Sequence, residues 1–319
     1  TTDCESKCAA NATCAGYTNN GGGVEAWGDN FYGGSSPGIT SNVKDIVTNF
    51  YAFAALKNDG SVKAWGASGF GGDDPGITSG VSKIFSTKSA FAALMDDGSV
   101  QTWGESGYGG GASGVGVGSD VVDIFSNEGA FAALKPNGGV LTWGSNSFGG
   151  GTGAPDGHAT AAHMIAVKIV PTRYTGGGCF AAILKNGEVK LWGSNGCRYP
   201  SPPTSAQSGV VDVTTLANNA VYAYAALKDD GSVVVWGSSA TDPSVADPGI
   251  TSGVTKIFSN DYAFAALKSD GSVQVWGDST NGGSDPSITS GVVEIFSTPK
   301  AFAALKSDGS VVAWGDSGY

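Results

Sequence analysis

Histidine, methionine and charged residues are scarce in this sequence of 319 residues. It contains two His and two Met, and Asp, Glu, Lys and Arg together make up 14% of it. Two histidines leave little material for a His-based metal site or for acid–base catalysis by imidazole. A run of about 18 apolar residues is also missing, so the sequence predicts no membrane-spanning helix. Association with a membrane-bound assembly stays open.

Catalytic sequence motifs are equally absent. The H-E-x-x-H pattern and the Walker loop do not occur, and these patterns mark zinc proteases and phosphate-binding loops. The formal net charge is −11, whereas nucleic-acid binding depends on clustered Lys and Arg. We therefore expect a protein that is not an enzyme, that uses no cofactor or metal, and that does not bind nucleic acid.

Glycine and hydrophobic residues are abundant instead. The chain has 52 Gly, and 40% of its residues are hydrophobic. This hydrophobic content can build a sizeable core, so the chain is not predicted to be disordered. Glycine at this level without a G-X-Y period excludes collagen and is typical of a turn-rich β protein.

Tryptophan marks an internal repeat. All eight tryptophans precede a glycine, at intervals of 38 to 49 residues. A period near 40 residues indicates a repeat architecture. Each unit reads V-x-x-I, then A-F-A-A-L-K, then D-G-S-V-x-x-W-G, then a Gly-rich stretch, as a comparison of residues 81–104 with 292–315 shows. The tryptophans are Trp27, Trp65, Trp103, Trp143, Trp192, Trp236, Trp276 and Trp314.

The turn signals inside each unit predict three strands. A-F-A-A-L-K and S-V-x-x-W-G are separated by Asp-Gly or Asn-Gly, the dipeptides most typical of tight hairpins. V-x-x-I contributes a further strand. A small sheet that is apolar on both faces has to be covered by the next copy on each side. We predict an all-β β-propeller of seven or eight blades, with eight W-G hairpin units counted and every tryptophan in the core of a blade.

The units differ in regularity. Residues 1–23 form a degenerate, Cys-rich N-terminal unit, and residues 24–319 form the repeat propeller, with irregular units at about 145–222. The repeat resembles that of the regulator of chromosome condensation family, in a compact form with about 40 residues per blade. That resemblance implies a propeller and invites guanine-nucleotide exchange as an activity. The acidic charge argues against this exchange activity, and family likeness is a poor guide to function.

The five cysteines favour an oxidising compartment. Cys179 and Cys197 flank one hairpin, and a disulfide between them is predicted. Cys4, Cys8 and Cys14 cluster at the start of the chain as further disulfide candidates. Free buried thiols are the alternative; a metal site at these three cysteines lacks a C-x-x-C pair. Disulfides would place the protein outside the cell or in an organelle lumen.

The irregular units carry the residues that we predict to bind a partner. Both arginines of the chain, Arg173 and Arg198, lie there, and Tyr199 follows the second. Arg and Tyr are enriched in the energetic centres of protein interfaces, and insertions in repeat proteins lie on loops. Sequence drift in an unselected loop is the competing interpretation.

The favoured function is therefore recognition. We expect a protein–protein interaction module or a subunit of a larger extracellular or luminal assembly. The alternative is a carbohydrate-binding propeller, suggested by aromatic and Gly-, Asn- and Asp-rich loops that recur in every unit.

Overall fold

The computed structural model describes residues 15–20, 22–111, 120–151, 165–172, 178–193, 201–217, 222–237 and 246–318. Over these ranges the regular elements are strands and short 3₁₀ turns. The strands form seven three-stranded antiparallel sheets and one two-stranded sheet. The chain divides into two compact units, residues 1–157 and 158–319, which are described one at a time.

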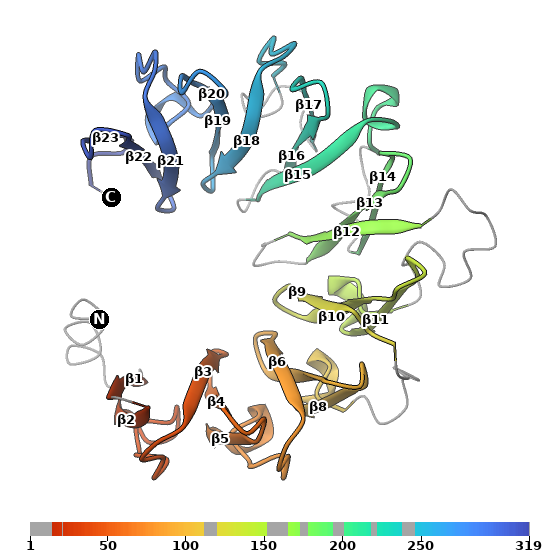
Figure 1. The fold of residues 1–319 in the computed structure, drawn as a ribbon, viewed down its shortest axis with the longest axis vertical. Helices are drawn as coiled ribbons and strands as arrows, with labels where there is room; N and C mark the ends of the chain where they lie inside the picture. The colour runs from red at the N-terminus through yellow and green to blue at the C-terminus, as the bar shows by residue number, and fades with distance from the viewer. Residues whose placement is uncertain are drawn as a thin grey trace. The chain divides into compact units, whose positions relative to one another are not determined.

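The first unit begins with a hairpin and continues with three blades, each visible as a separate group of arrows in Figure 1. The 3₁₀ turns η1 (Ser68–Phe70), η2 (Ser106–Tyr108) and η3 (Asn146–Phe148) follow the last strand of each blade. The strands are β1 (Ala15–Asn20) and β2 (Gly23–Gly28); β3 (Val43–Thr48), β4 (Ala52–Lys57) and β5 (Val62–Gly66); β6 (Val81–Ser86), β7 (Ala90–Met95) and β8 (Val100–Gly104); and β9 (Asp123–Ser126), β10 (Ala130–Leu134) and β11 (Val140–Gly144).

The second unit contains four blades of the same kind (Figure 1). Two further 3₁₀ turns are η4 (Thr204–Ala206) and η6 (Ser279–Asn281). The strands are β12 (Ala166–Pro171), β13 (Cys179–Leu184) and β14 (Val189–Gly193); β15 (Val210–Ala217), β16 (Tyr222–Lys228) and β17 (Val233–Gly237); β18 (Val254–Ser259), β19 (Ala263–Lys268) and β20 (Val273–Gly277); and β21 (Val292–Ser297), β22 (Ala301–Lys306) and β23 (Val311–Gly315).

The all-β propeller class predicted from the sequence is confirmed at the level of the blade. In every three-stranded sheet the middle strand is the A-F-A-A-L segment or its equivalent, as with β4 between β3 and β5. Within the described residues seven three-stranded blades are complete, and the W-G unit of Trp27 contributes the two-stranded hairpin β1–β2. Among the described residues no helix is long and apolar enough to cross a membrane.

The hairpin turns form as the Asp-Gly signal predicts. The Asp59 carboxylate accepts hydrogen bonds from the backbone N–H of Ser61 at 3.0 Å and from its hydroxyl at 2.6 Å. Gly60, between Asp59 and Ser61, has φ +76°, a backbone conformation that residues with a Cβ rarely adopt. The same carboxylate–serine pattern recurs at Asp97, Asp230, Asp270 and Asp308.

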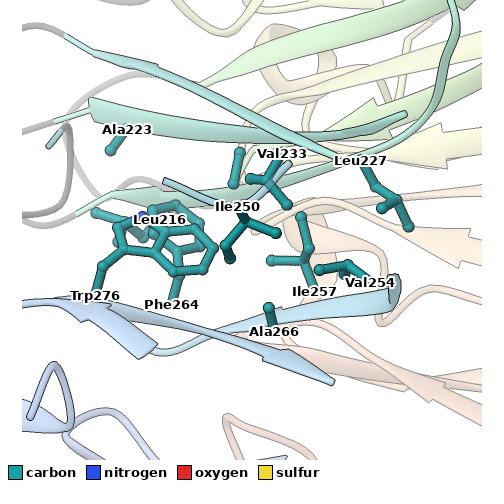
Figure 2. Close-up of a cluster of buried hydrophobic side chains, with 11 residues drawn as sticks. Leu216, Ala223, Leu227, Val233, Ile250, Val254, Ile257, Phe264, Ala266 and Trp276 are labelled. Carbon is teal, nitrogen blue, oxygen red and sulfur yellow. The ribbon is translucent and has the colours of Figure 1, made fainter. Parts of the chain in front are cut away.

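The core lies between successive blades. In the second unit, Leu227 of β16 and Val233 of β17 contribute to one apolar cluster with Ile257, Phe264 and Trp276 of the next blade, as Figure 2 shows. The alanines of β7 are fully buried because blades of the same unit cover both faces of its sheet, whereas Ala303 of β22 is half-buried. Small side chains allow the sheets to approach closely, while the large rings fill the remaining space.

The Gly- and Pro-rich stretch between blades also joins this core. Ile250 inserts its side chain between the two sheets in Figure 2 and is 5% exposed. Its carbonyl accepts a hydrogen bond of 3.1 Å from the N–H of Val233, on the last strand of the preceding blade. This backbone hydrogen bond holds the stretch along the edge of the third strand. Among the described residues the stretch does not form a fourth regular strand.

Candidate functional site

Seven of the eight predicted partner-binding and disulfide residues lie outside the described ranges. This applies to the partner-binding candidates Arg173, Arg198 and Tyr199, whose placement stays a prediction. It also applies to four of the five cysteines, Cys4, Cys8, Cys14 and Cys197.

Cys179 is the cysteine that the structure describes. It opens β13, is fully buried and is disulfide-bonded. The other cysteines lie outside the described residues, so the predicted pairing with Cys197 stays a prediction. Within the described ranges, no group of three or more His, Cys, Asp or Glu side chains is arranged to hold a metal ion.

The tryptophans stack inside the blades. In each three-stranded sheet the indole ring lies against the aromatic residue directly opposite on the middle strand, as with Trp276 and Phe264 at 5.1 Å. Five tryptophans are buried, Trp65, Trp143, Trp192, Trp236 and Trp276. The other three, Trp27, Trp103 and Trp314, are half-buried. The geometry makes these rings part of the packing of the blades.

A group of aromatic rings gathers on loops of the first unit, and sequence reasoning did not single it out. Tyr51, which precedes β4, lies 4.4 Å from the ring of Phe70 in η1. Tyr32 stacks on Tyr51 at 6.0 Å with an interplanar angle of 22°. These loops meet because β4 and β5 are antiparallel, with Ala52 at the start of β4 paired to the end of β5.

Two phenylalanines extend this group into solvent. Phe31 contacts Tyr32 edge to face at 5.2 Å, and Phe50 lies 6.4 Å from Tyr51. Their exposed fractions are 58% and 62%, which is unusual for large apolar side chains. The term aromatic patch is used below for Phe31, Tyr32, Phe50, Tyr51 and Phe70.

A half-buried polar residue, Asn49, holds part of the patch in place. The Asn49 side-chain oxygen accepts hydrogen bonds from the N–H groups of Tyr51 at 2.8 Å and Ala52 at 2.7 Å. Its amide nitrogen donates to the Phe70 carbonyl at 2.8 Å. One side chain thus fixes the loops of Tyr51 and Phe70, while on the third loop the Phe31 N–H donates to the Asp29 carboxylate at 2.8 Å. Asn127 and Asn260 bridge the corresponding loops of other blades.

The patch is specific to this part of the repeat. The position of Phe50 is occupied in other blades by Lys88, Glu128, Asp261 and Pro299. The sequence signal was the Phe50-Tyr51 pair, which merges with the following A-F-A-A-L run and looks like part of a buried strand. Only the tertiary structure shows that it precedes the strand.

A cation borders the patch. The Lys88 ammonium lies 5.2 Å from the centroid of the Phe50 ring, within the range of a cation–π contact. The backbone N–H of Lys88 donates a hydrogen bond of 2.7 Å to the backbone carbonyl of Glu128. Partial burial raises the pKa of the Glu128 carboxyl, and the Lys88 charge opposes that rise. The exposed edge of the patch therefore combines apolar rings with one positive charge.

Comparison with known proteins gives no close relationship. No family model matches the chain, and no curated protein matches it. Among solved structures, the ectodomain of the receptor kinase CR4 from Physcomitrella patens is 17% identical, with 83% of this chain and 70% of that chain covered and a TM-score of 0.44. Prp20p from Saccharomyces cerevisiae is 15% identical, with 81% and 68% covered and a TM-score of 0.41.

Proteins of the RCC1 type are among these structural neighbours. Prp20p is the yeast RCC1 protein, so the neighbours include the family whose repeat the W-G motif resembles. BamB from Moraxella catarrhalis is 12% identical, with a TM-score of 0.39; the match covers 97% of this chain and 98% of that chain. These likenesses concern the fold alone, and no activity or partner is taken from them.

Proposed function

We propose that this protein is a non-enzymatic propeller that binds another protein through the aromatic patch. The observation that carries the proposal is the exposure of Phe31 and Phe50 on loops that side-chain hydrogen bonds fix: Asp29 accepts from the Phe31 N–H, and Asn49 joins the residues that follow Phe50 to the loop of Phe70. Aromatic side chains contribute large contact area at low entropic cost, and rigid loops lose little further freedom on binding. Lys88 beside Phe50 favours a partner that offers a carboxylate at the edge of an apolar contact.

The proposed location is an oxidising compartment, either outside the cell or an organelle lumen. The disulfide at Cys179 supports this location, because disulfides persist where thiols are not continually reduced. The loops with Arg173, Arg198 and Tyr199 form a second proposed contact region, on the strength of their composition.

The test starts from native material. Cross-linking followed by mass spectrometry should identify a protein partner, whose affinity is then measured for purified variants. Removing both exposed rings, Phe31→Ala with Phe50→Ala, should weaken binding at least tenfold, about 1.4 kcal/mol. The matched control removes two similarly exposed side chains elsewhere, Val167→Ala with Val211→Ala, and should bind as the wild type does.

Two results would redirect the proposal. If the Phe31/Phe50 variant binds normally while Arg173→Ala with Arg198→Ala loses binding, the contact surface belongs to the irregular units. If native material yields no protein partner, the carbohydrate-binding alternative becomes the better one. Aromatic rings beside amide and hydroxyl groups, such as Asn30 and Ser35, suit that alternative, and a glycan array tests it.

A further inference from the structure

One exposed position of the blade carries charges whose sign alternates along the chain. It is the first-strand residue that pairs with the Leu or Ile at the end of the middle strand's A-F-A-A-L run or its equivalent, such as Asp45 opposite Leu56 and Lys83 opposite Leu94. In the first unit the position reads Asp, Lys, Asp, and in the second Lys, Asp, Lys, Glu. The term charge row is used for these residues: Asp45, Lys83 and Asp123 in the first unit, and Lys168, Asp212, Lys256 and Glu294 in the second.

The alternation extends to the degenerate first repeat in the sequence. Thirty-eight residues before Asp45, at the distance that separates the first regular units, the sequence has Lys7, which lies outside the described residues. The eight positions therefore read Lys, Asp, Lys, Asp, Lys, Asp, Lys, Glu in chain order. A regular alternation over every repeat is not expected of an unselected surface position.

The structure turns this alternation into contacts between blades. In the second unit, Lys168 lies 2.7 Å from Asp212, and Lys256 lies 2.9 Å from Glu294. In the first unit, Lys83 lies 3.5 Å from Asp123. Each of these pairs joins a lysine to the acid of the following blade. The side chains are 37–57% exposed, so each pair contributes little to stability by itself.

The apolar contacts between blades do not distinguish one neighbour from another. Phe264 packs on the Ala, Leu and Val side chains of the preceding blade, and Phe302 packs on equivalent Ala, Leu and Val side chains of its own predecessor. Any blade could therefore cover any other with similar apolar burial. Repeat proteins of this kind misassemble when one repeat takes the place of another.

We propose that the charge row determines which blades can pack side by side. A blade with a lysine at this position accepts an acidic blade after it, whereas two blades of the same sign would oppose like charges, which is unfavourable. The repeating unit of assembly is then a pair of blades, basic followed by acidic. The charges act mainly on the choice of neighbour, because the shared core supplies the stability of each interface.

The test reverses one charge of the row. Lys256→Glu places an acid beside Glu294, and Lys256→Gln removes the attraction without adding repulsion. At about 0.1 M salt we expect Lys256→Glu to refold from urea with a lower yield of soluble monomer than Lys256→Gln, and to melt about 2–4 °C below it. The difference should close in 1 M salt, where the screening length falls to about 3 Å.

Two further variants keep the test decisive. The swap Lys256→Glu with Glu294→Lys restores opposite charges and should recover yield and melting temperature, even if Lys256→Glu alone does not refold. Lys185→Glu changes net charge equally at an exposed lysine outside the row and should behave as wild type. Equal behaviour of Lys256→Glu and Lys256→Gln, a swap that recovers nothing, or an equal loss in Lys185→Glu would each overturn the proposal.

Discussion

The indole N–H of Trp65 donates a hydrogen bond of 3.1 Å to the carbonyl of Gly33, 32 residues earlier in the chain. Trp103 makes the same bond to Gly71, and Trp314 makes it to Gly282. The Gly-rich loop after one W-G dipeptide thus lies on the tryptophan of the next blade. This contact accompanies the 38-residue interval that separates each of these three tryptophans from the one before it.

The loop glycine should be irreplaceable where it touches the aromatic stack. Gly71 has φ +98°, and a Cβ there would lie 2.6 Å from the Phe91 ring. We expect Gly71→Ala to destabilise the protein by about 2–4 kcal/mol through backbone strain and overpacking. Gly69 in the same turn has open space around it, so Gly69→Ala is the matched control. Urea unfolding monitored by tryptophan fluorescence compares the two, and equal midpoints would contradict the packing described here.

Truncation of the tryptophans should cost core packing energy. Trp276 is 6% exposed and stacks on Phe264, and Trp103 stacks on Phe91 at 5.2 Å. Trp276→Ala or Trp103→Ala should therefore lower the free energy of unfolding by about 3–5 kcal/mol. Trp276→Phe keeps an aromatic ring and should cost less. Thermal denaturation measures the effect, and a loss under about 1 kcal/mol would indicate exposed binding residues instead.

The bridging asparagines should tolerate threonine better than alanine. Asn260 is buried, accepts from the N–H groups of Tyr262 and Ala263, and donates to the Asn281 carbonyl. Asn260→Ala leaves these backbone groups without their partner, which costs about 1–3 kcal/mol. Asn260→Thr should cost less, because Thr87 occupies the same position and bonds the Tyr108 carbonyl. Chemical denaturation of both variants checks this order, which would be wrong if they were equally unstable.

The hairpin aspartates should make the fold sensitive to acid. The Asp97 carboxylate has a lowered pKa because it accepts hydrogen bonds from the Ser99 hydroxyl and then from the Ser99 N–H. A lowered folded-state pKa means that this stabilisation is present above the unfolded pKa and is lost as the pH falls below about 4.

Replacing the hydroxyl donor isolates this effect. Ser99→Ala should raise the pKa of Asp97 towards its ordinary value, because the hydroxyl is the larger of the two causes. Carboxyl NMR titration measures the change, and Asp270, in another blade, serves as an internal reference that should not move. An unchanged Asp97 titration in the variant would contradict the assignment.

The Cys179 disulfide should resist labelling and stabilise the irregular part of the repeat. Cys179 is fully buried, so the native protein should not react with thiol reagents at this position. A non-reduced digest should yield the Cys179 peptide joined to that of Cys197, and Cys197→Ser should cost about 2–4 kcal/mol. A Cys179 peptide joined to Cys4, Cys8 or Cys14 would show that the predicted pairing is wrong.

Local signals in the sequence were sufficient to predict the strands and hairpins of each blade. Asp59 and Gly60 specify a hairpin within four residues of chain, and the apolar runs on both sides have no alternative to forming its strands. The number of W-G units and the burial of the A-F-A-A-L strands follow from the same pattern, because a sheet that is apolar on both faces needs covering copies. These features depend on residues that are neighbours in the chain.

Contacts between blades were decided only by the tertiary structure. Phe50 and Phe53 have the same chemistry and lie three residues apart, yet one is 62% exposed and the other 7%, because Asn49 holds the loop open before β4 begins. Likewise, no local pattern shows that Lys256 reaches Glu294, 38 residues later. The physical reason is that stacking aligns equivalent positions of successive blades, so the neighbours of a side chain lie one repeat away and not in its own segment.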